Sequence, residues 1–156
     1  MKKDTLLNAF GPRRTVLVDI DHTVSNAFHR DHMIDAATWD EYHAASINDE
    51  PVTDIVDMLR SLSRGYELVG ITARPEKWRG LTFAWLIKHK VPLDIVLMRP
   101  DDNYDMAPSL KVFLASVISR RLKDDIAFVM DDRPDVCEAF AREGITCLQV
   151  YARRDK

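Results

Sequence analysis

Five short apolar segments alternate with helical patterns along this chain, and this alternation limits the possible folds more than any other feature. Each segment is apolar at its centre, as buried parallel strands are. The segments are TVLVDI (15–20), YELVGIT (66–72), LDIVLM (93–98), DIAFVM (125–130) and TCLQVY (146–151). Strands that alternate with helices predict an α/β fold, in which helices cover both faces of a central parallel sheet.

Apolar residues three and four positions apart mark the helices between these segments. The expected buried stripes are Ile55, Leu59 and Leu62; Leu81, Ala84 and Trp85; Leu110, Leu114 and Val117; and Val136 with Phe140. Gly65 and Gly144 stand where two of the helices should end. Trp78 and Trp85 share one helix face by their spacing, so we expect both to pack in the core.

The composition is that of a soluble globular protein, with 46% apolar and 30% charged residues in 156 positions. It predicts a single domain over residues 1–156. The beginning of the chain, MKKDTLLNAFGPRR, lacks the apolar core of a signal peptide, and no run approaches the roughly 18 apolar residues of a membrane span. We therefore expect a cytoplasmic protein without a membrane span, in which Cys137 and Cys147 stay reduced.

The net charge of −3 gives no global basic field of the kind that attracts nucleic acid. A local basic rim for phosphates and an ordinary solvated face remain equally consistent with the sequence. The residues concerned are Lys77, Arg79 and Arg99, whereas Arg74, the fourth basic residue of the possible rim, favours a contact with phosphate.

Residues 24–50 interrupt the alternation, because they are polar, rich in aromatic and histidine side chains, and without a clear strand pattern. We interpret this segment as a small cap inserted after the first strand, lying over the carboxyl ends of the strands where ligands bind in open α/β sheets. The irregular spacing of His29, His32 and His43 favours solvated or substrate-facing roles over a zinc site. Trp39 and Tyr42 fit a small core of the cap and a stacking surface for a nucleobase equally well.

Charged and hydroxyl side chains gather where the predicted strands end. They are Asp19, Asp21 and Thr23 after the first strand, Thr72 and Arg74 at the second, Lys111 in the helix after the third, and Asp131 and Asp132 after the fourth. The carboxyl ends of parallel strands meet at one edge of a sheet, so these side chains should converge there.

The residue types that converge there predict a site for a metal ion and a phosphate group. Neighbouring carboxylates resist joint ionisation unless a cation lies between them, and Mg²⁺ prefers oxygen ligands of this kind. Thr72, Arg74 and Lys111 are then donors suited to a tetrahedral oxyanion such as phosphate. One aspartate can attack phosphorus, and a second, two residues on, can protonate the leaving alcohol and then activate water.

The four clusters, in this order, resemble the motifs of the haloacid dehalogenase (HAD) superfamily of phosphotransferases. Asp19, Asp21 and Thr23 match its D-x-D-x-T motif, and Thr72 and Lys111 match its second and third motifs. Asp131 and Asp132 match the acidic pair of the fourth motif, and the match covers residues 15–150. The resemblance implies a Rossmann-like three-layer sandwich and a phosphatase, because dehalogenases lack the second aspartate of the first motif.

Roles for individual residues come from this resemblance alone. It implies that Asp19 is the nucleophile and a metal ligand, and that Asp21 is the general acid and base, with its backbone carbonyl on the metal. Thr72, Arg74 and Lys111 would bind the substrate phosphate, and Lys111 would also orient Asp19. Asp131 would bind Mg²⁺ directly. Asp132 would support the metal, while Asp135 belongs equally well to the first turn of the following helix.

Within the superfamily, the chain looks most similar to the phosphatase half of phage-type polynucleotide kinase-phosphatases. The stretches that carry this likeness are ITAR (71–74), residues 79–100, VMDDRPDV (129–136) and GITCLQV (144–150). Two positions depart from the usual pattern, since His22 and Ala73 replace glycines.

The expected function is therefore Mg²⁺-dependent hydrolysis of a phosphomonoester through an aspartyl-phosphate, on a nucleotide or nucleic-acid end, as in a polynucleotide 3′-phosphatase. A 5′-(deoxy)nucleotidase acting on mononucleotides is the main alternative. A receiver-type phosphoacceptor is disfavoured because its acidic pair precedes the acceptor aspartate, whereas here the D-x-D comes first. An inactive phosphate-binding module is disfavoured because every expected catalytic group is present. No protein partner can be inferred from the sequence.

Overall fold

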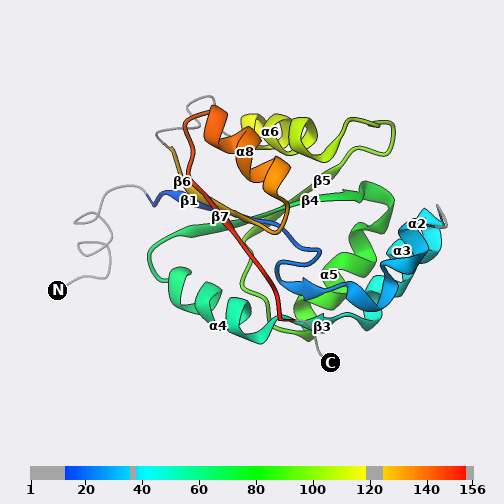
Figure 1. The fold of residues 1–156 in the computed structure, drawn as a ribbon. Coiled ribbons are helices and arrows are strands. Elements are labelled where there is room, and N and C mark those ends of the chain that lie inside the picture. Colours follow the sequence, from blue (N-terminus) through cyan, green and yellow to red (C-terminus); the bar gives the residue numbers. More distant parts are fainter. Residues whose placement is uncertain (1–12, 36–37, 119–124, 154–156) are drawn as a thin grey trace.

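The computed structural model of the chain describes residues 13–35, 38–118 and 125–153 (Figure 1). The strands in these ranges are β1 (Thr15–Val18), β2 (Ser25–Asn26), β3 (Glu50–Pro51), β4 (Glu67–Pro75), β5 (Ile95–Arg99), β6 (Ile126–Asp131) and β7 (Cys147–Gln149). The helices are α2 (His32–Asp35), α3 (Trp39–Ala45), α4 (Thr53–Leu62), α5 (Arg79–Lys88), α6 (Ala107–Ile118) and α8 (Pro134–Arg142). Short 3-10 helices are η1 (Phe28–Arg30), η2 (Ser46–Asn48) and η3 (Glu76–Trp78).

Five of the strands form one parallel sheet in the order β5-β4-β1-β6-β7. These are the five segments that the apolar runs predict, and the predicted α/β fold with a central parallel sheet is confirmed. The first strand, β1, lies in the middle of the sheet and has β4 and β6 as its neighbours. The residues after β1 therefore leave the sheet near its centre, with polar side chains from β4 and β6 on either side.

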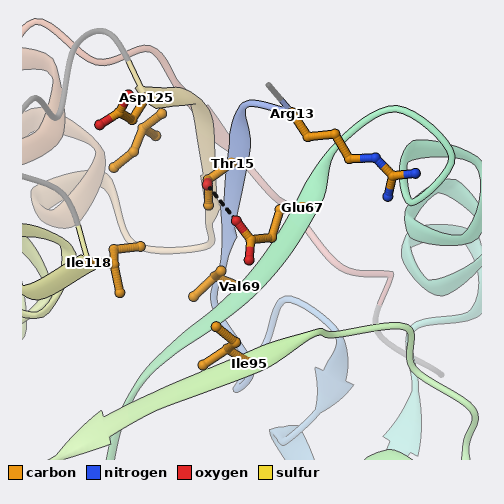
Figure 2. A pocket seen from close by; sticks show the side chains of 8 residues that line it. Arg13, Thr15, Glu67, Val69, Ile95, Ile118 and Asp125 are labelled. Atoms are coloured by element: carbon orange, nitrogen blue, oxygen red, sulfur yellow. Dashed lines mark hydrogen bonds between the residues drawn. The ribbon is translucent and has the colours of Figure 1, made fainter. Parts of the chain in front are cut away.

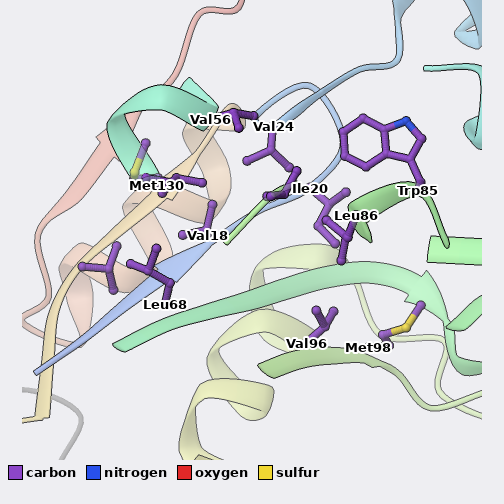
Figure 3. Close-up of a cluster of buried hydrophobic side chains, with 13 residues drawn as sticks. Val18, Ile20, Val24, Val56, Leu68, Trp85, Leu86, Val96, Met98 and Met130 are labelled. Carbon is purple, nitrogen blue, oxygen red and sulfur yellow. The ribbon is translucent and has the colours of Figure 1, made fainter. Parts of the chain in front are cut away.

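Side-chain alternation along the strands builds two apolar cores, one on each face of the sheet. Val16 and Val18 of β1 pack toward α4 and α5, in the cluster drawn in Figure 3. Leu17, between them, packs on the opposite face with residues of α6 and α8. Figure 1 shows these two helix pairs as the outer layers of a sandwich around the sheet. No helix among the described residues has the length and apolar character needed to cross a membrane.

The structure corrects several details of the expected elements. Ala84 of α5 and Val117 of α6 are exposed, and Thr82 and Leu86 are buried on α5 in place of Ala84. Helix α5 begins at Arg79, so Trp78 lies in η3 and does not share a helix face with Trp85. A stripe read from spacing alone misses these shifts because the sheet, and not the helix, fixes which face is covered.

Residues 24–50 lie between β1 and α4 and are called the cap below. The expectation that this segment has no strand is wrong, since Ser25–Asn26 and Glu50–Pro51 pair antiparallel at its base. Core helix α5 is joined to the cap through Trp85, which is fully buried and whose Nε1 donates to the carbonyl oxygen of Asp49 over 2.8 Å. The base of the cap is thus fixed to the core at both of its ends.

Candidate active site

Two aspartates lie side by side where β1 and β6 end. The parallel register pairs Val18 with Met130, so the next residues, Asp19 and Asp131, are adjacent. The backbone N–H of Asp19 continues the ladder by donating to the carbonyl oxygen of Met130 over 2.9 Å. The sheet itself therefore sets the separation of these two carboxylates.

Asp19, Asp131 and Asp132 each offer one carboxylate oxygen within a group whose atoms all lie within 4.8 Å of one another. Lys111 reaches this group from α6 and donates to both of the buried acids. Its Nζ lies 2.7 Å from Asp19 Oδ1 and 2.6 Å from Asp131 Oδ2. Lys111, Asp19 and Asp131 are all buried. The structure thus brings together the residues of three predicted motifs.

The charges in this cluster do not balance. Burial raises the pKa of Asp19 well above its ordinary value, and the neighbouring carboxylates of Asp131 and Asp132 add to this against the opposing charge of Lys111. Burial also works against the charge of Lys111, but the two carboxylates that it contacts outweigh burial and raise its pKa. One lysine therefore faces three acids. A set of hard oxygen donors with a deficit of positive charge fits a divalent cation such as Mg²⁺.

The turn after β1 is wound tightly around the carbonyl of Ile20, which accepts the backbone N–H groups of Thr23, Val24 and Ser25. His22 in this turn has φ 61°, in the left-handed region that few residues other than glycine adopt. Its Nε2 lies 2.9 Å from Asp31 Oδ1 of the cap. This position explains why a glycine suits the motif and how a histidine is tolerated here.

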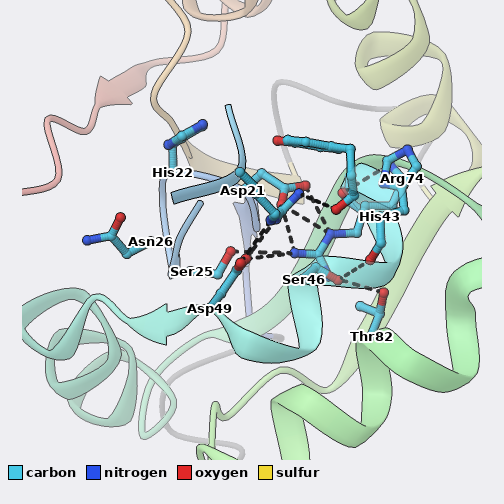
Figure 4. Close-up of polar contacts among 12 residues, drawn as sticks. Asp21, His22, Ser25, Asn26, His43, Ser46, Asp49, Arg74 and Thr82 are labelled. Carbon is cyan, nitrogen blue, oxygen red and sulfur yellow. Dashed lines mark hydrogen bonds and ion pairs between the residues drawn. The ribbon is translucent and has the colours of Figure 1, made fainter. Parts of the chain in front are cut away.

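Asp21 is not a member of the acidic group, and its carboxylate contacts two buried arginines (Figure 4). Arg74 holds it through two nitrogens, with Nη2 2.7 Å from Oδ1 and Nε 3.0 Å from Oδ2. Arg30 of the cap donates to Asp21 Oδ1 as well. Arg30 in turn binds Asp49 through Nε and Nη2, at 2.8 and 2.7 Å. Core and cap meet in this network.

Both arginines keep Asp21 ionised. Burial alone raises the pKa of Asp21, but the charges and hydrogen bonds of Arg74 and Arg30 outweigh burial and hold the pKa well below its ordinary value. In this arrangement Asp21 is an ionised carboxylate without a proton to donate. In the structure the guanidinium of Arg74 forms an ion pair with Asp21, the second aspartate of the D-x-D motif, and its role in binding substrate phosphate stays a prediction.

The predicted strand 66–72 ends at Thr72, but β4 continues to Pro75 and therefore also contains Arg74. Thr72 is buried, and its Oγ1 accepts the backbone N–H of Arg74 over 3.2 Å. Alternation along the strand turns both residues to the same side of the sheet. The structure therefore groups Thr72 with Arg74 and Asp21.

Asp135 lies apart from the acidic group. Its carboxylate pairs with Arg133 and accepts the N–H of Val136 in the first turn of α8. Of the two acids left open beside Asp131, geometry thus places only Asp132 near it.

The residues of the possible basic rim form ion pairs and hydrogen bonds with other residues of the chain. Lys77 pairs with Asp40 at 2.7 Å, and Arg79 pairs with Glu76 at 2.5 Å. The guanidinium of Arg99 donates to the backbone carbonyls of Ala73, Asn103 and Asp105. These contacts favour an ordinary solvated face over a basic rim that binds phosphates.

Arg30 and Asp49 are members of the site that sequence reasoning missed. Both are buried in a segment that reads as polar and exposed, and their partners lie 9 and 19 residues away without a regular spacing. The centre of the Tyr42 ring lies 4.1 Å from the Arg30 guanidinium carbon. This aromatic residue is the feature of the sequence that could have indicated a buried part of the cap around Arg30.

A cavity of about 380 Å³ lies at the opposite edge of the sheet, where the strands begin (Figure 2). Thr15 and Glu67, the first residues of β1 and β4, line it and share a hydrogen bond of 3.4 Å. The acidic cluster is at the other end of these strands, so this cavity is separate from the candidate active site.

A parallel α/β sheet with buried Asp–Lys–Asp contacts at its carboxyl edge defines a phosphatase of the HAD superfamily. The family described as the polynucleotide kinase PNKP phosphatase domain matches residues 13–154, and the chain belongs to this family. No curated protein matches the chain.

Solved structures share the fold. A chain of the Pnkp1/Rnl/Hen1 complex superposes with a TM-score of 0.73 at 24% identity, over 92% of this chain and 48% of that one. This protein thus spans about half the length of that relative. A haloacid dehalogenase-like hydrolase of Streptococcus pneumoniae superposes with a TM-score of 0.65 at 14% identity, over 88% of this chain and 84% of that one. A HAD enzyme of Bacteroides thetaiotaomicron, in complex with magnesium and inorganic phosphate, superposes with a TM-score of 0.60 at 13% identity, over 92% of this chain and 97% of that one.

Proposed function

We propose that this protein is a Mg²⁺-dependent phosphomonoesterase that removes phosphate from nucleotide or nucleic-acid ends through an aspartyl-phosphate on Asp19. The observation that carries the proposal is the buried Asp19 carboxylate, held by Lys111 at the carboxyl edge of the sheet beside Asp131 and Asp132. Membership of the PNKP phosphatase family supports both the reaction and the substrate class.

The proposed reaction has two steps. A carboxylate oxygen of Asp19 attacks phosphorus, the bond from phosphorus to the ester oxygen breaks, and Asp21 gives a proton to the leaving alcohol. Asp21 then takes a proton from water, whose oxygen attacks the acyl-phosphate and frees inorganic phosphate and Asp19. Lys111 orients Asp19 through its 2.7 Å contact in both steps.

Substrate binding lets Asp21 take up, from solvent water, the proton that it then gives to the leaving alcohol. An incoming phosphate is an anion that competes with Asp21 for the donors of Arg74, because guanidinium groups bind phosphate and carboxylate with the same bidentate geometry. When Arg74 moves onto the phosphate, Asp21 loses its strongest partner and its pKa rises toward the range of a general acid. Thr72, beside Arg74 on β4, is the further phosphate ligand of the proposal.

Asp19, Asp131, Asp132 and the backbone carbonyl of Asp21 are the proposed Mg²⁺ ligands. The bound ion would offset the repulsion between the acids and the substrate phosphate and polarise the phosphoryl oxygens. The surplus of negative charge around Lys111 is the property of this chain that supports the assignment.

Replacing Asp131 with asparagine should weaken Mg²⁺ binding at least about tenfold and lower the rate at saturating substrate, because the amide keeps the shape but not the charge. Calorimetric titration of Mg²⁺ and the Mg²⁺ dependence of phosphate release measure the two effects. Asp135→Asn is the matched control, since Asp135 lies outside the acidic group. Unchanged Mg²⁺ affinity in D131N would contradict the ligand role.

Two substrate classes fit the site. One solved relative is part of an RNA repair complex, which supports a polynucleotide end as substrate. Two observations instead favour a mononucleotide, because binding along a polymer draws on unpaired basic groups. The net charge is −3, and the side chains of Lys77, Arg79 and Arg99 are paired within the chain.

The deciding experiment measures phosphate release, with Mg²⁺ and with a chelator. The substrates are 3′-phosphorylated DNA and RNA oligonucleotides and 5′-(deoxy)nucleoside monophosphates, with D19N as the control. Chelator-sensitive release that is faster from an oligonucleotide establishes a polynucleotide 3′-phosphatase. Release mainly from the monophosphates establishes the nucleotidase. Release from neither, by a protein that hydrolyses another phosphomonoester, would refute the proposed substrate class.

A further inference from the structure

Trp39, the first residue of α3, is the exposed aromatic side chain of the cap, with 51% of its surface accessible. Tyr42, one helical turn on, is buried, and the two rings meet edge to face at 5.9 Å. A tryptophan whose role was to fill the interior of the cap would be covered as Tyr42 is. Half of this large apolar ring faces solvent instead.

The exposed ring lies close to the candidate active site. Tyr42, which Trp39 contacts, has the guanidinium carbon of Arg30 4.1 Å from its own ring centre, and Arg30 is ion-paired with Asp21. One aromatic side chain therefore separates Trp39 from the arginine that holds Asp21. Figure 1 shows α3 at the end of the molecule to which β4 points, where the acidic cluster lies.

A second contact fixes α3 against the core on the same side. Asp40, next to Trp39, pairs with Lys77 at 2.7 Å, and Lys77 comes three residues after Arg74. The beginning of α3 is thus held to the segment that follows β4. Trp39 is thus linked through Tyr42 to the arginine network and stands next to the residue that pairs with the segment after β4.

The Trp39 ring packs against other aromatic side chains that carry no charge. His43 stacks beside it with ring centres 6.3 Å apart and an angle of 26° between the planes, and Trp78 lies behind His43 at 6.1 Å. Burial lowers the pKa of His43 to about 4, so its imidazole is neutral at neutral pH. An ordered aromatic surface of this kind loses little conformational freedom when a flat ligand stacks on it.

We propose that Trp39 is the stacking surface for the nucleobase next to the scissile phosphate, and that it makes the enzyme prefer nucleotide phosphates over phosphomonoesters without a base. This inference rests on the proposed function and adds the residue that selects the substrate class. Every base has a flat π-face, so the preference should hold for all four bases.

The test compares two substrates that differ only in the base. One is an oligonucleotide with a 3′-phosphate on its last nucleotide, and the other carries the same 3′-phosphate on a base-free sugar. Wild-type protein should prefer the first in kcat/KM, and W39A should reduce this preference about tenfold, mainly through KM. W39F keeps a flat ring and should keep most of the preference. Phe113→Ala, equally exposed at 51% but on α6, is the matched control and should leave the preference unchanged.

A binding measurement separates stacking from a structural role. Indole fluorescence of D19N should be quenched by the 3′-phosphorylated oligonucleotide, and D19N/W39F should lose most of that quenching while its melting temperature stays the same. An equal loss on both substrates in W39A and W39F, or an unchanged preference in both, would overturn the inference. A wild-type enzyme that hydrolyses both substrates equally would also overturn it and leave the proposed function standing. Release from neither substrate, and none from the 5′-(deoxy)nucleoside monophosphates, would refute the proposed function itself.

Discussion

Replacing Asp19 with asparagine should abolish phosphate release, with a fall in kcat of at least about a thousandfold, because the amide cannot form the acyl-phosphate. Steady-state phosphate release on whichever substrate proves active measures the loss. Labelled substrate and an acid quench should trap phosphate on the wild-type protein but not on D19N.

The same variant should keep its fold and its ligand. The amide has the size of the carboxylate and removes one negative charge from the group around Lys111, at the expense of one ion pair. We therefore expect the free energy of unfolding to stay within about 1 kcal/mol of the wild-type value, and the affinity for a phosphate ligand to stay within about tenfold. D19N that is folded and fully active would exclude Asp19 as the nucleophile.

Replacing Arg30 with glutamine should lower the free energy of unfolding by about 3–5 kcal/mol, because it leaves the buried Asp49 carboxylate without its bidentate partner. Arg30 is fully buried and pairs with both Asp21 and Asp49, whereas Arg74, which also pairs with Asp21, lies farther from Asp49, at 3.6 Å. Urea denaturation followed by circular dichroism measures the change.

Arg60→Gln is the matched control for this prediction. Arg60 makes an ion pair of similar length with Asp57, but both side chains are exposed on α4, where such pairs contribute between 0 and about 1 kcal/mol. In the double variant R30Q/D49N the uncompensated carboxylate is gone, so part of the loss should be recovered. A loss of less than about 1 kcal/mol in R30Q would show that water, His29 at 2.8 Å or Arg74 at 3.6 Å from Asp49 compensates the charge.

The sheet could be predicted from sequence because its signal is local and repeated. Each strand is a short apolar run, and the polar residues that follow β1 and β6 mark the functional edge. The antiparallel pair at the base of the cap was missed because strands of two residues carry no periodicity. The end of β4 was placed too early, at Thr72, because the charged Arg74 suggests a loop, whereas in the fold its backbone N–H donates to Thr72 and its guanidinium to Asp21.

The acidic cluster could be anticipated from the motifs, since strand ends of one parallel sheet must meet. The arginine network could not. Its residues come from the cap, from the first turn and from β4, and only the folded chain shows that Arg30 and Arg74 share Asp21. Charged side chains in a polar insertion are by default solvated, and nothing in the spacing of Arg30 and Asp49 distinguishes them from the others.

The hydrogen bond from Trp85 to the backbone of Asp49 has a consequence for how substrate enters. Core helix and cap share a buried donor and acceptor, and the acceptor residue also binds Arg30. To lift the cap as a hinged lid would expose a whole tryptophan and break this network, at a free energy that approaches sub-global unfolding. Native-state hydrogen exchange should accordingly find the base of the cap and α5 opening as one cooperative unit. Substrate should then reach the acidic cluster with the cap in place, because the cap does not open separately from the core.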